Sequence, residues 1–180
     1  MFPLIFSRRR CISKSMLAVG ALLSLDDSWA SEVEEDGLSH DAEAIHQEPV
    51  FKASPKRLYD ALLDARQFQK IELLGSAMKA SDLQAMPAQI SNEVGGAFSI
   101  FAGFITGRQL ELVPNQRIVQ SWRETSWPAG IHSIVKFEIT AQESGSKIQF
   151  DHTGFPAGTG PHLASGWKAN YWDTMNKFFA

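Results

Sequence analysis

The chain has 180 residues, of which 44% are hydrophobic and 21% charged, and its formal net charge is −3. This length suits one globular domain with short appendages, and the hydrophobic content is sufficient for a buried core. Beyond residue 30 the chain is acidic on balance and has no cluster of lysine and arginine, unlike nucleic-acid binders and proteins held on anionic lipid. We therefore expect no nucleic-acid partner.

Residues 1–30 have the pattern of a secretory signal peptide. A basic stretch at 7–14 precedes the short apolar run "MLAVGALLSL" at 16–25, and the small residues Ser28 and Ala30 follow. An apolar run this short cannot span a hydrocarbon layer of about 30 Å, so we expect a signal peptide and no stable membrane anchor. The predicted location is the periplasm or the outside of the cell.

Arg8 and Arg9 give this segment a likeness to the twin-arginine export motif, so the twin-arginine export machinery is an expected partner. The match is partial, because Cys11 and Ile12 stand where the motif prefers Phe and Leu. A basic tail without a targeting role, or a misassigned start codon, would explain the same residues. Cys11 is the single cysteine of the chain, which excludes a thiol nucleophile in the domain that follows.

An acidic segment, residues 31–44, comes next and contains few large apolar side chains. Such a composition is typical of a flexible, solvated linker. We expect the folded domain to occupy residues 45–180. His40 and His46 lie in or beside the linker, and we interpret them as incidental histidines rather than as metal ligands.

The domain begins with a predicted strand and a predicted helix. Residues 45–53 alternate weakly between apolar and polar side chains, which favours a strand. Residues 54–71 predict one helix, with Ser54 as the N-cap and Pro55 in the first turn.

Residues 87–153 have an apolar period of two, which indicates strands. Pro114 with Asn115, and later Gly145, mark tight turns between consecutive strands. We therefore expect an antiparallel meander. Gly103 and Gly107 could let a strand coil or let another backbone approach, although plain turn chemistry would explain them equally well.

The C-terminal segment 162–179 predicts a helix of about 18 residues, or about 27 Å at 1.5 Å per residue. Its apolar side chains recur every three or four positions, as expected for one buried face: Leu163, Trp167, Tyr171, Met175 and Phe178. A helix near the start, a meander and a long last helix together predict the α+β class.

Three stretches then carry a family resemblance: "VGGAFSIFAGFITGRQLELVPNQRIVQSWR" at 94–123, "FDHTGFP" at 150–156 and "GWKANYW" at 166–172. They resemble the SRPBCC superfamily, also called START-like or helix-grip, and within it the homologues of the C-terminal domain of the heat-shock-protein-90 ATPase activator. The resemblance implies a curved antiparallel β-sheet wrapped around a long C-terminal α-helix, with short helices after the first strand. It also implies an apolar cavity between the sheet and the last helix.

Aromatic side chains supply most of the candidate ligand contacts, although a stripe of such residues on a helix is more often part of a core. We expect the helix to contribute its inner face and the sheet to contribute the opposite wall. The candidate ligand-binding residues are Phe98, Phe104, Trp122, Phe150, His152, Trp167, Tyr171 and Met175.

His152 shares the apolar strand face with Ile148 and Phe150, because the three residues are two positions apart. One hypothesis makes it a polar anchor or a general base in the cavity. The alternative is a half-buried histidine that is hydrogen-bonded to the loop or to the start of the last helix. The residues alone leave both open.

A metal site is not expected, and neither is a cofactor. His152 and His162 could supply two ligands only if the intervening loop folds back, and no third ligand follows in a recognised spacing. The glycines and prolines of 154–161 instead predict a loop that ends the last strand and turns the chain toward the helix.

Three functions remain open. The first is an exported domain that binds a small apolar or aromatic molecule without catalysing a reaction. The second is an enzyme of the polyketide-cyclase or isomerase kind, with His152 as the base and Tyr171 or Arg108 polarising a carbonyl. The third, a co-chaperone-like interaction protein, rests only on the family resemblance.

Overall fold

The computed structural model describes residues 43–180. The predicted signal peptide 1–30, and the predicted linker apart from its last two residues, lie outside the described residues. Ala44, the last of these two, already belongs to the first strand, where it pairs with Thr153.

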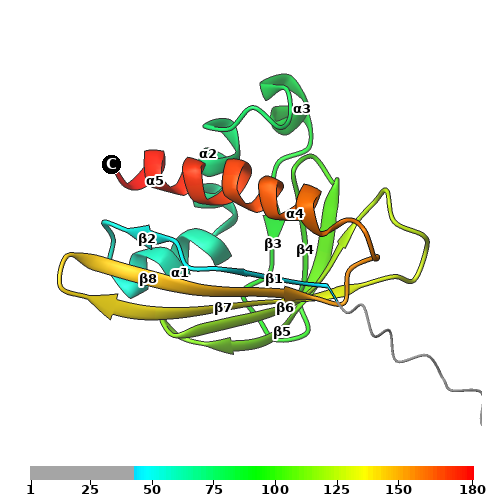
Figure 1. The fold of residues 1–180 in the computed structure, drawn as a ribbon. Coiled ribbons are helices and arrows are strands. Elements are labelled where there is room, and N and C mark those ends of the chain that lie inside the picture. Colours follow the sequence, from blue (N-terminus) through cyan, green and yellow to red (C-terminus); the bar gives the residue numbers. More distant parts are fainter. Residues whose placement is uncertain (1–42) are drawn as a thin grey trace, which may run out of the picture. The chain divides into compact units, whose positions relative to one another are not determined.

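Eight strands form one antiparallel sheet in the order β1-β8-β7-β6-β5-β4-β3, with β2 paired to the other half of β8 (Figure 1). The strands are β1 (Ala44–Gln47), β2 (Val50–Phe51), β3 (Gln89–Ile90), β4 (Ala97–Ile100), β5 (Ile105–Val113), β6 (Arg117–Glu124), β7 (Ser133–Gln142) and β8 (Gly145–Thr153). The long strands β5 to β8 are consecutive in both sequence and space, which confirms the predicted meander.

Strand β5 has two local irregularities, a bulge and a close backbone contact at Gly107. The pairing of β5 with β6 shifts register between Gln109 and Glu111, and such a bulge bends a strand. At Gly107 a Cβ atom would lie 2.0 Å from the carbonyl oxygen of Ser121 and 2.4 Å from the Phe98 ring. Gly107 therefore allows the close approach of another backbone. Of the two explanations that the sequence left open, this one fits and plain turn chemistry does not.

Two helices, α1 (Pro55–Leu63) and α2 (Ala65–Leu73), replace the single helix predicted for 54–71. Asp64 separates them because its backbone is extended, at φ −87° and ψ 113°, and its carboxylate accepts a hydrogen bond from the backbone N–H of Gln67 at 2.9 Å. Asp64 is thus the C-cap of one helix and the N-cap of the next. A third short helix, α3 (Ala80–Ala85), precedes β3.

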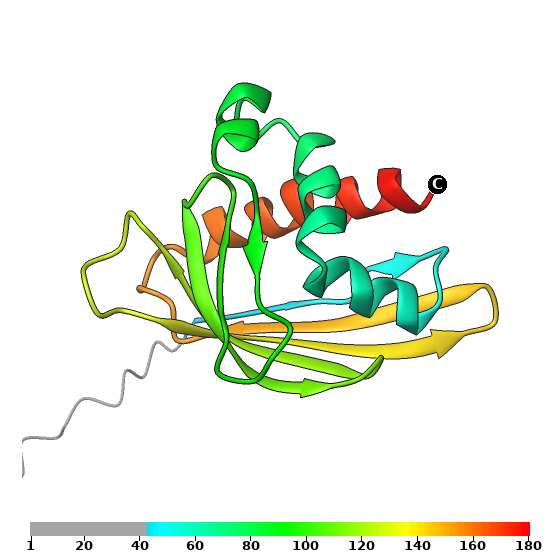
Figure 2. The same cartoon turned by 180° about the vertical axis from the view of Figure 1, so that it is seen from behind.

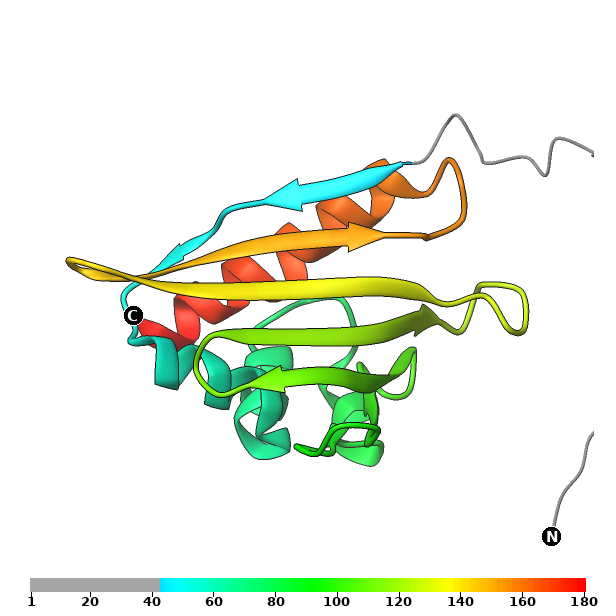
Figure 3. The same ribbon diagram turned by 90° about the horizontal axis from the view of Figure 1, so that it is seen from below.

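The last helix is continuous over 20 residues, but its middle turn is a π-helix. Its parts are α4 (Gly160–Trp167), η1 (Lys168–Trp172) and α5 (Asp173–Phe179). It runs across one face of the sheet, with α1, α2 and α3 on the same side (Figures 1, 2 and 3). The chain therefore has the α+β, helix-grip architecture that the resemblance implied.

The π-helical turn moves the buried stripe by one position. Tyr171 and Trp172 are both buried, and in the last turn Phe179 is buried whereas Phe178 is only half-buried. Phe178 packs against the edge of the core, as predicted, but Phe179 is the more deeply buried of the two. A uniform 3.6-residue period does not contain the extra residue that a π-turn inserts.

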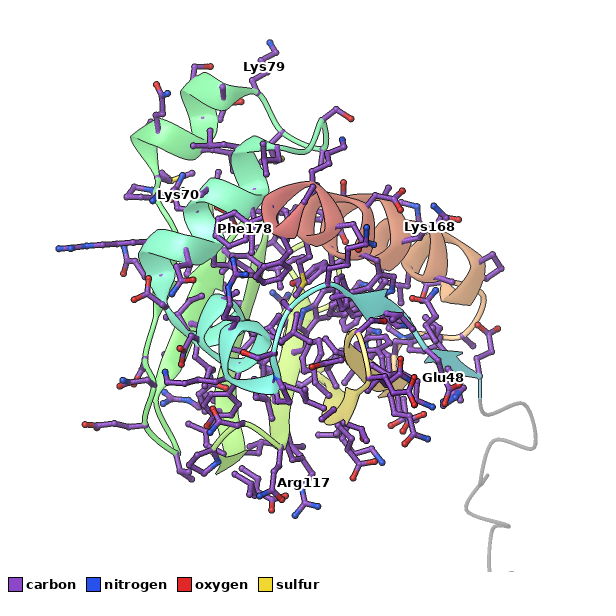
Figure 4. The ribbon with its side chains drawn as sticks, turned by 90° about the vertical axis from the view of Figure 1, so that its left-hand side faces the viewer. Glu48, Lys70, Lys79, Arg117, Lys168 and Phe178 are labelled. Atoms are coloured by element: carbon purple, nitrogen blue, oxygen red, sulfur yellow. The ribbon has the colours of Figure 1, made fainter. Side chains whose placement is uncertain are left out.

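The outer face of the sheet carries ion pairs beside a few exposed apolar side chains such as Leu110 and Ile134. Lys136 lies 3.1 Å from both Glu138 and Asp151, and the Asp151 carboxylate also lies 2.6 Å from Nδ1 of His46. Charged side chains such as Arg117 and Lys168 lie at the periphery in Figure 4. The core therefore lies on the other face, between the sheet and the last helix. Within residues 43–180, the helices are too short or too polar to qualify as membrane spans.

Candidate functional site

A cavity of about 380 Å³ lies between the first half of the last helix, the β4–β5 turn and the ends of β5 and β6. Aromatic and aliphatic side chains make up most of its wall. The lining residues are Ala77, Met78, Phe101, Phe104, Ile105, Trp122, Glu124, His162, Leu163, Gly166, Trp167, Asn170 and Tyr171. Its volume is within the range of small-molecule sites, about 300–1,000 Å³.

Four of the eight predicted ligand-binding residues line this cavity: Phe104, Trp122, Trp167 and Tyr171. Phe104 lies at its mouth and is 37% exposed, whereas the other three are almost fully buried. The remaining four, Phe98, Phe150, His152 and Met175, are buried on the same side of the sheet but do not line the cavity. Ligand binding by any of the eight stays a prediction.

The helix presents a continuous face to the cavity. Leu163, Gly166, Trp167, Asn170 and Tyr171 are three or four positions apart, so they fall on one side of the helix. A Cβ atom at Gly166 would meet nothing within 4 Å, because this glycine faces open space. At Gly166, therefore, the face of the helix that lines the cavity lacks a side chain.

The turn between β4 and β5 forms part of the opposite wall. Phe101, Ala102 and Gly103 all have positive φ, at 51°, 52° and 81°, which is a costly conformation for the first two residues. The backbone N–H of Phe101 donates to Oε1 of Glu72 at 2.5 Å, and that of Phe104 donates to the Phe101 carbonyl at 3.0 Å. These bonds hold the turn in the shape that places Phe101 and Phe104 on the cavity wall.

Glu72 is a charged residue in an apolar position. It is only 2% exposed, and its second oxygen, Oε2, has no partner among the described residues. Burial raises the pKa of its carboxyl to about 7, although the hydrogen bond from Phe101 acts in the opposite direction. The carboxyl behind the β4–β5 turn can therefore change charge near neutral pH.

His152 lies on the apolar face of β8, as its spacing from Ile148 and Phe150 predicted. Its Nδ1 accepts a hydrogen bond from the indole N–H of Trp167 at 3.0 Å, so Nε2 carries the proton. Nε2 in turn lies 2.7 Å from the Ser133 hydroxyl, whose own proton goes to the Trp122 carbonyl at 3.1 Å. Burial lowers the pKa of His152 to about 3.

These bonds match the structural hypothesis for His152, in which the ring is tied to the last helix. Both ring nitrogens are used, and the neutral form is strongly favoured by burial. The ring is covered by Trp122, Phe155 and Trp167, with ring centroids 4.9–5.7 Å away. The geometry therefore does not support His152 as a general base for a molecule in the cavity.

Few polar groups face the cavity. The Trp122 indole N–H is buried without a well-formed hydrogen bond to any described residue, and Tyr171 contributes its phenol ring. Burial raises the pKa of the Tyr171 hydroxyl, which keeps it protonated. Glu124 accepts a hydrogen bond from the Ser126 hydroxyl at 3.1 Å. No lysine or arginine is among the lining residues, and Arg108 instead donates to the Gly95 carbonyl at 2.9 Å.

A more open hollow of about 570 Å³ adjoins the mouth of the cavity and shares Phe104, Glu124 and His162 with it. The loop that follows β8 forms one rim. Glu43 holds this loop, because its carboxylate accepts hydrogen bonds from the backbone N–H groups of Gly158 and Gly160, at 2.7 and 3.1 Å. Glu43 thus occupies the N-terminus of the last helix, where a negative charge is favourable.

Within residues 43–180, no three histidine, cysteine, aspartate or glutamate side chains form a group suited to a metal ion. His162 lines the cavity mouth, whereas the nitrogens of His152 bond Ser133 and Trp167. The structure does not bring the two histidines together as ligands.

Sequence reasoning missed several lining residues. Gly166 and Asn170 could have been found, because they share a helical face with Leu163 and Trp167. Met78 and Phe101 could not, since they lie in irregular segments without a period. Glu72 gave no signal either, because a glutamate in an amphipathic helix ordinarily faces water.

Comparisons with known proteins agree with this architecture. The profile of the family described as "Activator of Hsp90 ATPase homolog 1-like protein" matches residues 52–180. A solved structure, an HSP90 activator from Plasmodium falciparum, superposes with a TM-score of 0.63 at 23% identity, covering 73% of this chain and 92% of that one. At this identity the superposition shows the fold alone.

Two similar sequences carry the name "Activator of 90 kDa heat shock protein ATPase homolog". The one from Dictyostelium discoideum is 28% identical over 131 residues, which cover 72% of this chain and 31% of the relative. Homolog 1 from Homo sapiens is 27% identical over 130 residues, which cover 72% of this chain and 35% of the relative. The chain therefore spans about a third of the length of these curated relatives.

Proposed function

Because the chain belongs to the family described as Activator of Hsp90 ATPase homolog 1-like protein, and because its helix-grip fold encloses an apolar cavity, we propose that the domain binds a small apolar or aromatic molecule. The binding is not coupled to a reaction. The observation that carries this proposal is the cavity of about 380 Å³, which is built from the helix, the sheet and the strained β4–β5 turn.

Two features of the wall support a binding role. Gly166 leaves open space on the cavity side of a helix, where an alanine would favour the helix by about 1 kcal/mol. The β4–β5 turn has two non-glycine residues at positive φ. Strained backbone of this kind is concentrated at ligand and active sites.

A cavity-filling substitution tests the proposal. Gly166→Leu should place an isobutyl group in the cavity, because a Cβ atom at this position meets nothing within 4 Å. The apolar dye nile red should then bind at least tenfold more weakly than to the wild type. The matched control is Ala169→Leu, which places the same leucine side chain on an exposed part of the helix outside the cavity lining. Fluorescence titration measures both affinities, and thermal denaturation confirms that both variants are folded. Equal dye binding by wild type and Gly166→Leu would contradict the proposal.

The enzyme alternative needs a proton-transferring group within reach of a substrate. Its nominated base, His152, does not line the cavity, and its ring nitrogens bond Ser133 and Trp167. The nominated Arg108 bonds the Gly95 carbonyl. Of the groups in that hypothesis, only Tyr171 lines the cavity, so we favour binding without catalysis.

A co-chaperone-like interaction is a second candidate because the relatives are named as activators of a heat shock protein ATPase. These relatives are roughly three times as long as this chain, so their named activity is only a proposal for it. Addition of the purified domain to the chaperone of the same organism tests it, since a co-chaperone would change the rate of ATP hydrolysis.

We also propose that residues 1–30 direct export, a proposal that the sequence pattern alone supports. Replacing Arg8 and Arg9 together by lysine should leave precursor in the cytoplasm if the twin-arginine route is used. Cell fractionation followed by immunoblotting measures this. Normal processing of the double variant would contradict the twin-arginine route, and a wild-type protein that is never processed would contradict the signal peptide.

A further inference from the structure

If the cavity binds a small molecule, as proposed above, the chemistry of its wall restricts the kind of molecule that fits. The side chains around the cavity are mostly carbon, and the rings of Trp167 and Tyr171 lie 4.2 Å apart between their centroids. Flat aromatic surfaces of this kind favour a ligand with rings of its own, because offset or edge contacts add to the burial of apolar area.

The charges around the cavity disfavour an anionic ligand. Glu124 is part of the wall. The buried carboxyl of Glu72 adds a second negative charge above its pKa of about 7, close enough to Tyr171 to raise the pKa of that hydroxyl. Lysine and arginine are absent from the lining residues, and the exposed His162 lies at the mouth, which the outer hollow shares. A carboxylate that entered would lose its hydration without gaining an ion pair, which is costly.

Two hydrogen-bond donors at the cavity, the Trp122 indole and the Tyr171 hydroxyl, have no well-formed hydrogen bond to an acceptor within residues 43–180. The Trp122 indole can only donate, and its N–H is buried without a partner. The Tyr171 oxygen lies close enough for this N–H to donate to it weakly, which lowers the pKa of that hydroxyl, but not with the geometry of a well-formed hydrogen bond. The hydrogen bonds among the described residues also include none from the Tyr171 hydroxyl. Buried donors without partners are rare in folded proteins.

An acceptor atom in the ligand would complete this pair. If the Tyr171 hydroxyl donates to such an atom, its oxygen becomes a better acceptor for the Trp122 N–H, because hydrogen bonds in a chain polarise one another. We infer that the cavity binds an uncharged aromatic compound with a carbonyl oxygen, which accepts a hydrogen bond from Tyr171 while Trp122 positions the tyrosine.

Three probes that share two phenyl rings on one central carbon test this inference. Benzophenone has a carbonyl between two phenyl rings, diphenylmethane has a methylene in its place, and diphenylacetate carries a carboxylate. Calorimetric or competition titration of the full chain should give benzophenone about fivefold to tenfold tighter binding than diphenylmethane, which corresponds to one neutral hydrogen bond. Diphenylacetate should bind most weakly of the three.

Variants assign the preference to the two donors. Tyr171→Phe should bind benzophenone and diphenylmethane with nearly equal affinity, while its affinity for diphenylmethane stays within about twofold of the wild type. Trp122→Phe should lower the ratio partly. Trp127→Phe is the matched control, because Trp127 packs on Trp122 but lines only the outer hollow, and it should keep the wild-type ratio.

The possible failures are distinguishable. Equal binding of benzophenone and diphenylmethane by the wild type would overturn the inference but leave the proposed function standing, and so would the tightest binding by diphenylacetate. A ratio that persists in Tyr171→Phe would also overturn it. If none of the three probes binds, the proposed function fails and the inference fails with it. The comparison on the wild type needs no variant, so a substitution that unfolds the domain does not remove the test.

Discussion

His152 illustrates how far a pattern of residues can be taken at the scale of a single side chain. Period two correctly places it on the apolar face of β8. The same face, however, bounds both the cavity and the core, so the period cannot distinguish a ligand contact from a structural bond. The partners Ser133 and Trp167 decide the matter, and they are 19 and 15 positions away in the sequence.

Glu72 gives the most direct prediction at the residue scale. Burial raises the pKa of its carboxyl from 4.5 to about 7, so the folded state holds this proton more tightly than the unfolded state does. The resulting stabilisation is complete below pH 4.5 and is lost as the pH rises through about 7. Glu72→Gln removes this titration, so the variant should gain stability relative to the wild type by about 2–3 kcal/mol between pH 5 and pH 8.

Urea denaturation of both proteins across this pH range measures the difference. His152 has the opposite sign, since its pKa is lowered to about 3 and its contribution is lost as the pH falls below 6.5. It is present in both proteins, so it cancels in the comparison. Glu143→Gln, a substitution of an exposed carboxyl, is the control and should follow the wild type. Parallel curves for wild type and Glu72→Gln would contradict the buried, protonated carboxyl.

At the scale of elements, the last helix was predictable in place and length but not in its winding. The buried stripe up to Tyr171 follows the expected spacing, and the π-helical turn then adds Trp172 to the buried side. Trp172 packs on Phe51 and Phe150 and stacks at 5.8 Å on Trp167. The local sequence does not predict this π-helical turn, because the turn depends on contacts between the helix and side chains of the sheet.

The division between α1 and α2 escaped prediction for a related reason. The apolar spacing of Leu58, Leu62 and Ala65 continues through the break, and an aspartate within it is as expected on the solvent side of one helix as at a cap. The backbone of Asp64 is extended and not helical, and only this observation identifies Asp64 as a cap.

The facing of the last helix can be tested with two adjacent residues. Trp167 is buried, bonds His152 and packs on Phe150 at 4.3 Å between ring centroids, so Trp167→Ala should destabilise the domain by about 3–5 kcal/mol. Lys168→Ala should have little effect, because this side chain is 69% exposed and its ion pair within residues 43–180 is with the half-exposed Asp173. Chemical denaturation measures both, and equal losses would contradict the orientation of the helix.

For the whole molecule, the meander and the last helix followed from local patterns, and the family resemblance implied the grip of one on the other. The candidate site was predictable only in part. Trp122, Trp167 and Tyr171 lie on regular elements with a clear period, whereas Met78, Phe101 and Glu72 reach or support the cavity through irregular segments and tertiary packing. A cavity is formed between elements, so no single element's pattern contains it.

Native mass spectrometry of the protein purified from its own host tests the central claim most directly. The wild type should carry a noncovalent extra mass of one defined, uncharged small molecule, and Gly166→Leu, purified in the same way, should lack it because its side chain fills the cavity. A wild type without any added mass, or the same mass on both proteins, would contradict binding in the cavity between the sheet and the last helix.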